Sequence, residues 1–596
     1  MKRRLLIALW IFAALCNISA QNIPVPLTYT RLYDYLDELL TDGIITAQTV
    51  VRPYSRLQVA TMLQQAQDAD SLLTVRQKAD LAFYLNEFAL ERDTMVSNFV
   101  QYTDHSTFSL SVADPQFSYR SANNMFKLRL RPILGANIAM SKKGALLHRW
   151  YGAELQLDIA KHLSVWGSLR DNSWSGNWLS RDYFPTDIAR IHGARIHYGA
   201  SQQQPALSPM TGVQYKEANY GGDFSDSKGG INLYTWWGSV GLQRENISWG
   251  TASHASNILS GRNPAVPMLT LQLTPCPWFQ LDYFHAWLVS NVLDSTYYYL
   301  ENTAGHTQAV KNYRPYNKFM AANMLTFMPI KQLSLSVGNS VIYAEQTIQA
   351  AYLIPIAFYK SLDHLLTKGV RTQNQNSQVF ASLSVRPVRH LHLYGSFFVD
   401  EVKFSRFKPS NPENNPISYL VGFDWSGWPI SGLSLKGEFV RSYIACYTHS
   451  INVLTWESNS YNMGHYMGDN AQSIYAELAY RPVRGLLLKC SYTNDIKYNS
   501  YAYQRDNISQ TIAQKPFSRA VYRNDEWRLD GVYEPHPNMY MTLSIAYNHA
   551  QGFDNPTNDG LASEYLGNAQ YYLDRFCPLY YQGKNLTISA AFSFGF

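Results

Sequence analysis

The chain has 596 residues and a formal net charge of +6; only 16% of its residues are charged, 14% are aromatic, and 43 are tyrosines. The longest apolar run, residues 5–16, is shorter than the roughly 18 residues that a membrane-spanning helix needs, and the mean hydropathy is −0.25. These values exclude a helical membrane protein and are atypical of soluble enzymes, but they fit a transmembrane β-barrel, in which lipid-facing and lumen-facing residues alternate.

The N-terminus has the parts of a secretory signal peptide: basic residues 2–4, the apolar run, and the small-residue site Ile18-Ser19-Ala20. We expect residues 1–20 to be removed, which lowers the net charge from +6 to +3 because three basic residues and no acids are lost. A lipoprotein starting at Cys16 is disfavoured, since Leu15 stands where a small residue is expected. The remaining charge indicates no nucleic-acid partner.

Residues 28–92 are predicted to form three short amphipathic helices. The first has apolar residues at helical spacing and ends before Gly43, Ser55 can cap the second, and Thr74 with Gln77 forms a capping-box pattern for the third. A bundle of this size is marginal alone. We therefore expect residues 21–106 to be a periplasmic domain that packs against the barrel as a plug.

From residue 107 to residue 596 the pattern changes to the period of two that is typical of strands. Phe126, Leu128 and Leu130 alternate with Lys127, Arg129 and Arg131, and further alternations begin at Leu333 and Leu433. The last segment alternates from Leu586 to a terminal Phe596, which resembles the signal that the barrel assembly machinery recognises in outer-membrane proteins.

Proline-containing turns divide this region at intervals. Prolines at positions 275, 329, 387, 429, 482 and 535, which are 42 to 58 residues apart, each precede an apolar strand pattern. Each interval holds two strands and one long loop, as in outer-membrane barrels with short periplasmic turns and long external loops, two of them at residues 346–377 and 549–583. With further turns near His162 and within 200–240, we predict about 18 antiparallel strands, with 20 as the alternative, around a lumen rather than a packed core.

Two sets of side chains are candidates for ligand binding. Lys127, Arg129 and Arg131 would face the lumen and could attract an acidic glycan, or pair with bundle acids such as Asp37 and Glu38. Aromatic residues in predicted loops could stack on sugar rings, although barrels also carry aromatic girdles at both membrane interfaces. These aromatic residues are Trp174, Trp178, Trp249, Tyr297, Tyr298 and Tyr299.

Catalytic and metal-binding patterns are scarce. The sequence has no nucleophile elbow, zinc helix or phosphate-binding glycine loop, and its four cysteines after residue 20 have no metal-site spacing. His465 and Asp469 lie four residues apart, and His392 shares a strand face with Asp400. A turn or lumen hydrogen bonding explains both pairs better than catalysis. We therefore expect no enzyme activity, no cofactor and no metal.

Three stretches, together with the signal peptide, the bundle and the barrel, resemble the Wzi family of capsule assembly proteins. They are VGLQRENISWGTASHASNILSGRN at 240–263, which runs on to residues 267–271, LYGSFFVDE at 393–401, and YNMGHYMGDNAQSIYAELAYRP at 461–482. The first departs from the family pattern in lacking a Gly-Pro-Gly step at residues 248–251.

The resemblance implies an outer-membrane barrel of 18 strands that binds and retains exported capsular polysaccharide like a lectin, without catalysis. We expect a monomer surrounded by outer-membrane lipid. Lys127, Arg129, Arg131, Trp249, Asp400, His465 and Asp469 are the candidate ligand-binding residues. A plugged transport barrel for a small solute is the alternative function, and an outer-membrane enzyme is a third.

Overall fold

The computed structural model describes residues 22–47, 49–92, 107–111, 115–160, 162–176, 213–218, 221–290, 292–301, 310–366, 375–459, 461–498, 515–555 and 568–595. The predicted signal peptide, Trp178 and Phe596 lie outside this set. Within these ranges, every helix is too short or too polar to cross a membrane.

Three helices form the N-terminal bundle, as predicted: α2 (Thr30–Thr41), α3 (Arg56–Asp68) and α4 (Val75–Glu87). The predicted cap at Ser55 and the predicted capping box at Thr74 are both present, and Ser55 forms a complete capping box as well. The Ser55 hydroxyl accepts a hydrogen bond from the Gln58 amide at 3.1 Å, and Thr74 and Gln77 make the equivalent pair. Gly43 follows α2 with a φ of +70°, which glycine adopts without strain. Apolar side chains of all three helices form one core, which also includes Tyr540 of the barrel.

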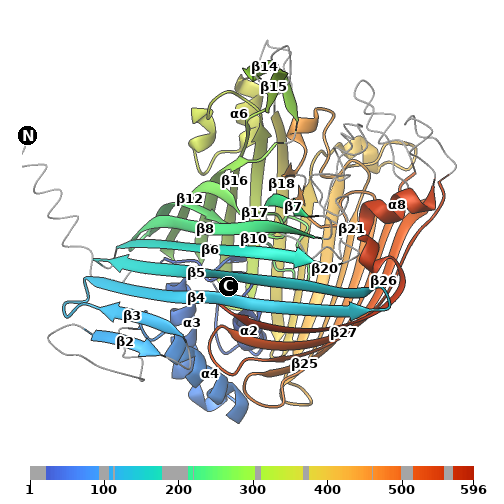
Figure 1. Ribbon diagram of the computed structural model, residues 1–596. Helices are drawn as coiled ribbons and strands as arrows, with labels where there is room; N and C mark the ends of the chain where they lie inside the picture. The colour runs from blue at the N-terminus through green and yellow to red at the C-terminus, as the bar shows by residue number, and fades with distance from the viewer. Residues whose placement is uncertain are drawn as a thin grey trace, which may run out of the picture.

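Within the described residues, eighteen antiparallel strands form a closed barrel, in agreement with the first predicted count. Figure 1 shows the arrangement of the wall. Closure joins the last strand to the first, with Phe594 opposite Leu134. In chain order the strands are β4 (Phe126–Ser141), β5 (Gly144–Ile159), β6 (Leu163–Ser175), β8 (Gly221–Thr235), β9 (Gly238–Glu245), β12 (Val266–Cys276), β13 (Phe279–Leu288), β16 (Lys318–Ile330), β17 (Leu333–Tyr343), β18 (Gln375–Val388), β19 (Leu391–Val399), β20 (Ile417–Ser426), β21 (Leu433–Ser442), β24 (Ala471–Tyr480), β25 (Leu486–Tyr498), β26 (Ala520–Tyr533), β27 (Met539–Gly552) and β28 (Gly583–Phe594).

Short additional strands extend the wall or lie outside it. The pair β2 (Thr107–Ser111) and β3 (Gln116–Arg120) joins the first half of β4, and β7 (Val213–Ala218) pairs with β8. The hairpin of β14 (Leu293–Glu301) and β15 (Val310–Pro315) stands apart from the wall. Two small sheets belong to loops: β1 (Val51–Arg52) with β10 (Ser248–Trp249) and β11 (Leu259–Ser260), and β22 (Glu457–Ser458) with β23 (Tyr461–Asn462).

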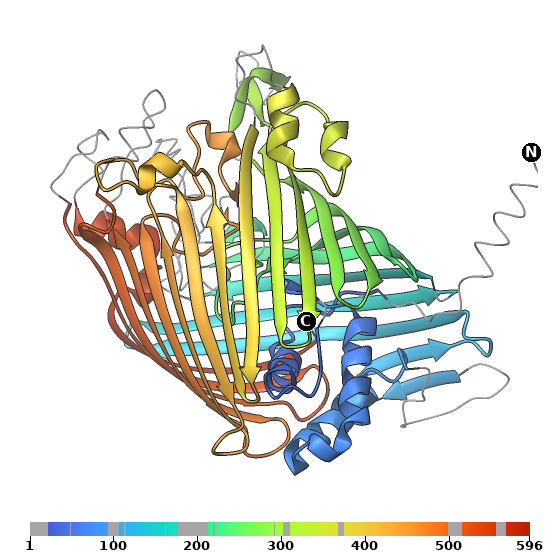
Figure 2. The same cartoon turned by 180° about the vertical axis from the view of Figure 1, so that it is seen from behind.

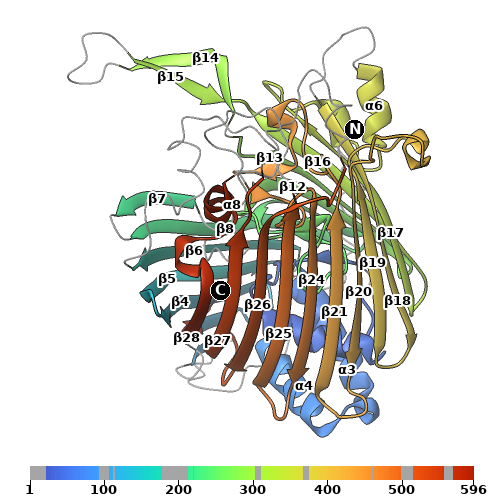
Figure 3. The ribbon, with the colours of Figure 1, turned by 90° about the vertical axis from the view of Figure 1, so that its right-hand side faces the viewer.

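The two ends of the barrel differ as the proline spacing predicts. All six proline-containing turns are short links between neighbouring strands, from β12–β13 to β26–β27. The bundle lies at this turn end, and the long connections, with α6 (Tyr359–Leu366) and α8 (Ala569–Phe576), lie at the opposite loop end (Figures 1 and 3). Only the tight β4–β5 hairpin is a short link at the loop end among the described connections. We propose that the turn end is periplasmic, because outer-membrane barrels have short periplasmic turns and longer external loops.

Alternation along the strands separates an apolar outer wall from a polar inner one. Leu335 and Val337 are 44% and 41% exposed on the outside of β17, while the alternating Ser334 and Ser336 are buried inside. Four of the exposed tryptophans in the described residues lie at or beside the turns, as an aromatic girdle at a membrane interface would, whereas Trp527 is exposed in the middle of β26. The four are Trp236, Trp278, Trp425 and Trp428.

The prediction of a lumen without a packed core is wrong for a large part of the interior. Loops 246–265 and 443–470 fold inward and bury Trp249, Ile258, Tyr447 and Trp456 against inward-facing Met and Phe side chains of β12 to β19. The physical reason is that apolar residues carried by these loops can leave water only by packing inside the barrel. The bundle at the turn end and the loops above it therefore occupy a large part of the described interior.

Candidate functional site

The predicted basic stripe fastens the bundle to the barrel wall. Glu87, at the end of α4, has a completely buried carboxylate. Its Oε1 lies 3.0 Å from Arg131 Nη1, 3.2 Å from Arg56 Nη1 and 3.4 Å from Arg129 Nη1. Lys127 donates to the carbonyl oxygen of Leu90 at 2.8 Å. These side chains are 2–4% exposed and face the bundle. They form internal contacts rather than an open ligand surface.

The electrostatics at Glu87 follow from its three guanidinium neighbours. Burial by itself raises the pKa of this carboxyl, but Arg131, Arg129 and Arg56 together hold its pKa well below the usual range. Of the two roles predicted for the basic stripe, ion pairing with the bundle is confirmed. The acids predicted to form these pairs, Asp37 and Glu38, have other partners. Asp37 pairs with Arg52, and Glu38 pairs with Arg76. The bundle acids that reach the stripe are Glu87, at the end of α4, and Glu91 just beyond it, and Glu154 of β5 lies 3.7 Å from Arg131.

Trp249 is a core residue and not a surface platform for sugar. Its side chain is 2% exposed, and its ring lies edge-on to Phe284 and Phe380 at centroid distances of 5.1 and 5.8 Å. The motif that contains it runs down the inside of the barrel, where Trp249 pairs with Val51 of the N-terminal segment. Its aromatic faces are covered, so stacking on a ligand is excluded in this conformation.

His465 and Asp469 stabilise a buried loop, as the turn interpretation predicts. Asp469 accepts hydrogen bonds from the Ala445 amide at 3.0 Å and from Lys497 Nζ at 2.8 Å. His465 Nδ1 accepts from the Met467 amide at 3.3 Å, and its ring is 2% exposed. Burial, with a contribution from Arg262, lowers the pKa of His465 to about 3, so the imidazole is neutral.

Asp400 and His392 are not brought together. Asp400 follows β19 at the loop end and accepts hydrogen bonds from the Tyr447 amide at 3.1 Å and from Gln378 at 3.3 Å. Burial raises the pKa of Asp400 to about 7. His392 lies eight residues earlier, about 26 Å along an extended strand, and contacts the Ser384 hydroxyl at 2.8 Å. Each residue has a structural partner, and they form no acid–base pair.

No group of three His, Cys, Asp or Glu side chains in the described ranges could hold a metal ion.

The contacts described above show that none of the seven predicted ligand-binding residues forms an open site. Three of the six predicted aromatic residues are covered or undescribed: Trp174 and Trp249 are buried, and Trp178 is outside the described residues. The remaining three, Tyr297, Tyr298 and Tyr299, are exposed on β14, where the Tyr298 ring lies 5.7 Å from that of Tyr313.

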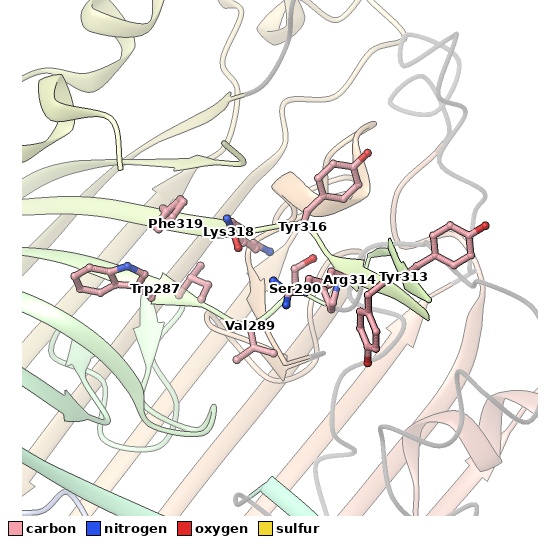
Figure 4. A pocket seen from close by; sticks show the side chains of 12 residues that line it. Trp287, Val289, Ser290, Tyr313, Arg314, Tyr316, Lys318 and Phe319 are labelled. Atoms are coloured by element: carbon pink, nitrogen blue, oxygen red, sulfur yellow. The ribbon is translucent and has the colours of Figure 1, made fainter. Parts of the chain in front are cut away.

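An open pocket lies at the loop end, between the base of the β14–β15 hairpin and the rim of β13 and β16 (Figure 4). Its volume is about 670 Å³. Trp287 and Phe319 line one end, Tyr313 and Tyr316 the other, and Arg314 lies between them. Tyr299 of β14 and Lys318 of β16 also line it. This pocket combines aromatic walls with an accessible guanidinium.

The hairpin presents its polar and aromatic groups outward. Tyr297 and Tyr299 are 56% and 52% exposed, and Tyr313 is 40% exposed. The Arg314 guanidinium lies 5.2 Å from the Tyr297 ring centroid, in the range of a cation–π contact. Tyr313, Arg314 and Tyr316 were missed in the sequence, although the run Tyr-Arg-Pro-Tyr at residues 313–316 carries the same aromatic and basic character as residues 297–299.

Such a lining suits a ligand with both flat apolar faces and negative charge. Tyrosine rings provide apolar surface with a polar edge, and guanidinium groups bind carboxylates through paired hydrogen bonds. Sugar rings have apolar C–H faces, and acidic sugars add a carboxylate.

Comparison with known proteins decides the family. The family model of the capsule assembly protein Wzi matches residues 194–560, which is more than half of the chain. The chain belongs to the Wzi family. No curated protein sequence matches it. The resemblance inferred from residues 240–271, 393–401 and 461–482 is thereby confirmed.

The fold agrees with this assignment. The structure of Escherichia coli Wzi, described as an outer-membrane, carbohydrate-binding β-barrel involved in group 1 capsule assembly, is similar with a TM-score of 0.53 at 11% identity, covering 97% of this chain and 99% of that chain. Pseudomonas aeruginosa OprD and Acinetobacter baumannii OccAB2 score 0.38 and 0.39 at 10% and 8% identity, covering 78% and 79% of this chain and 94% and 98% of theirs. This Wzi-family protein is an outer-membrane capsule assembly protein.

Proposed function

We propose that this protein binds exported capsular polysaccharide at the cell surface and keeps the capsule attached, through the pocket at the base of the β14–β15 hairpin. The exposed tyrosines and Arg314 around this pocket are the observation that carries the proposal. Its place at the loop end supports it, because external loops of such barrels face the medium. The carbohydrate binding stated for Escherichia coli Wzi supports it further.

The chemistry of the pocket favours an acidic glycan. Exposed tyrosine rings can stack on sugar faces, and Arg314 can pair with a uronic acid carboxylate or a similar group. The basic stripe of β4 is not needed for this, because its charges are used by Glu87. We propose binding without catalysis, since each described His–Asp candidate is tied to structural partners.

We also propose that the protein works as a monomer and that the barrel assembly machinery inserts it. The alternating pattern of β28 supports the second point, since Leu586 and Ile588 are 52% and 49% exposed on the outer wall. A transport barrel is the less favoured alternative, because the bundle and the inward loops occupy much of the described interior.

Binding of purified protein to the capsular polysaccharide of its own organism tests the pocket. In Arg314→Gln we expect about ten- to hundred-fold weaker binding, since a hydrogen bond to a charged group contributes roughly 1.5–3 kcal/mol. In Tyr313→Ala the loss should be about three- to ten-fold, as expected for an aromatic contact. Trp236→Ala is the matched control, because Trp236 is 56% exposed at the turn end. Equal binding by all three variants and the wild type would contradict the pocket assignment.

A cellular experiment tests the function itself. Cells that lack the gene should release capsule into the medium, and complementation with Arg314→Gln should restore attachment less well than complementation with the wild type. Microscopy of stained capsule and assay of released polysaccharide measure this. Normal attachment in the deletion strain, together with impaired uptake of a small solute, would instead support the transport alternative.

A further inference from the structure

The connection between β17 and β18 does not simply project into the medium. Its residues 346–366, which we call the apron, include a short 3₁₀ turn (Ala350–Leu353) and α6. The apron lies against the outside of the barrel wall near the loop end of β16 and β17 (Figures 2 and 3). A connection in this place covers part of the wall that would otherwise face lipid.

Two asparagines on the outer wall hold the apron. Asn323 of β16 and Asn339 of β17 are paired, and both lie on the outward face, since the neighbouring Met324 and Ser340 point inward. Their side-chain amides donate to the Ala357 carbonyl oxygen at 2.9 and 3.2 Å, and the Tyr359 amide donates to Asn339 at 2.9 Å. Uncovered asparagines facing lipid would be unsatisfied, so these bonds fix the apron to the wall.

An aromatic layer fills the space between the wall and the apron. The Tyr343 ring of β17 lies 5.2 Å from the Phe319 ring and 4.9 Å from the Tyr352 ring. Tyr283 of β13 donates to the Tyr352 carbonyl oxygen at 3.0 Å. Tyr352 and Tyr359 are completely buried although they belong to a connection between strands. The inner side of the apron is therefore a packed interface.

The outer side of the apron is apolar and uncovered. Ile356 and Phe358, which flank the anchored Ala357, are 69% and 50% exposed, and Ile354 is 48% exposed. Leu365 of α6 is 69% exposed as well. Exposed apolar side chains that stand together mark a contact with a membrane or a partner.

The position of the apron along the membrane normal indicates that its exposed apolar side chains contact the membrane and not a partner protein. Asn339 is six residues from the turn end of β17, or about 15 Å along the membrane normal for a tilted strand, and the apolar band of such a barrel is about 25 Å tall. Asn339 is also aligned with Val379 of β18, which is 40% exposed on the bare wall beside the apron. Ile356 and Phe358 therefore lie at the same height along the barrel as the lipid-facing side chains of the neighbouring wall, such as Val379.

We propose that the apron is inserted in the outer leaflet of the membrane and that Ile354, Ile356 and Phe358 contact lipid acyl chains. Lys360 follows Phe358 in the first turn of α6. Helices that lie in a membrane interface carry basic residues that interact with lipid headgroups. This contact is independent of polysaccharide binding. The apron adds a lipid anchor to the barrel on one side only.

A photoreactive side chain tests the proposal in the full-length protein. The analogue p-benzoylphenylalanine replaces Phe358 in one variant and Ile356 in another, and each protein is reconstituted in vesicles of dioleoylphosphatidylcholine. Val379 on the bare wall is the lipid-facing reference, and Val75, 88% exposed on α4, is the water-facing control. Mass spectrometry measures the yield of lipid adducts, and the heat-induced shift in electrophoresis checks that each barrel is folded.

We expect lipid adducts at positions 358 and 356 within about two-fold of the yield at Val379 and about ten-fold above the yield at Val75, as for side chains buried at the acyl boundary. Yields equal to that at Val75 in a folded barrel would overturn the proposal. Cross-links to a second protein chain at both positions, without lipid adducts, would also overturn it and identify the apron as a protein-binding surface.

Discussion

At the scale of single residues, one buried carboxylate joins guanidinium groups of the bundle and of the barrel wall. Glu87 contacts Arg56 of the bundle and both Arg129 and Arg131 of β4, and its side chain is completely buried. Its own helix supplies no basic residue in the last turn. The ion pairs therefore link the bundle to the wall and contribute little to the helix itself.

Glu87→Gln should loosen the bundle. Removing one partner of a buried ion-pair network leaves guanidinium charges uncompensated and costs about 3–5 kcal/mol. Hydrogen exchange of the α4 amides measures this as lost protection. Asp70→Asn is the control, because Asp70 and Lys78 form an exposed pair with 60% and 44% exposed side chains, worth at most about 1 kcal/mol. Equal protection in the two variants would show that the Glu87 network does not hold the bundle.

Asp400 makes stability depend on pH. Its pKa in the folded protein is raised to about 7, mainly by burial, whereas in an unfolded chain it is about 3.9. In the folded state Asp400 therefore stays protonated up to a higher pH than in the unfolded chain. Its contribution to stability is complete below about pH 4 and is lost as the pH rises through about 7. Asp400→Asn should gain stability relative to the wild type between pH 5 and pH 8, as measured by the temperature at which the folded electrophoretic form disappears. A pH-independent difference would contradict this assignment.

At the scale of elements, connections between strands do more than link them. Loop 246–265 enters the barrel, where β10 pairs with β1 of the N-terminal segment, and the apron covers the outer wall. The same kind of segment thus packs inside, packs outside or, like the β14–β15 hairpin, stands free.

A substitution of Trp249 tests how much the packing of loop 246–265 inside the barrel contributes to stability. Trp249→Ala should destabilise the folded barrel by about 3–5 kcal/mol, because a large side chain is removed from a packed core. The exposed Trp236→Ala should change stability little. Urea-induced loss of the folded electrophoretic form compares the two variants. If Trp249→Ala unfolds at the same urea concentration as Trp236→Ala, the loop core is not part of the cooperative structure.

At the scale of the whole molecule, the buried ion pairs of the bundle and the tyrosine-rich pocket lie at opposite ends of the barrel. The bundle lies at the turn end, and the β14–β15 hairpin lies at the loop end (Figure 1). The bundle is linked to the wall by ion pairs, and the tyrosine-rich pocket lies at the base of the hairpin. Phe319 belongs both to the pocket lining and to the aromatic layer beneath the apron. A polysaccharide held in the pocket would therefore lie beside the part of the protein that we place in the outer leaflet.

The orientation of the barrel can be tested in intact cells. Leu300→Cys, at a position 62% exposed on β14, should react with a membrane-impermeant maleimide in whole cells. Leu72→Cys, at a position 50% exposed beside the bundle helices, should react only after the outer membrane is opened. The wild type is the control for the native cysteines. The opposite labelling pattern would invert the orientation and remove the pocket from the cell surface.

Local patterns in the sequence were sufficient for the elements themselves. The capping boxes at Ser55 and Thr74, the alternation that begins at Phe126 and the proline turns depend on residues a few positions apart. Strand number follows from the turns, because each short turn joins two strands. For this reason the bundle, the closed barrel and its two unlike ends could be predicted.

The site residues could not be predicted in the same way. Whether Trp249 is a platform or a core residue depends on the direction its loop takes, and whether Arg131 is open or paired depends on which acid docks beside it. Periodicity determines which face of a strand a side chain occupies but says nothing about what covers that face. The sequence by itself determined the class of barrel and its family, whereas only the tertiary structure decided where the open pocket, the buried charges and the apron lie, because these contacts join residues tens to hundreds of positions apart.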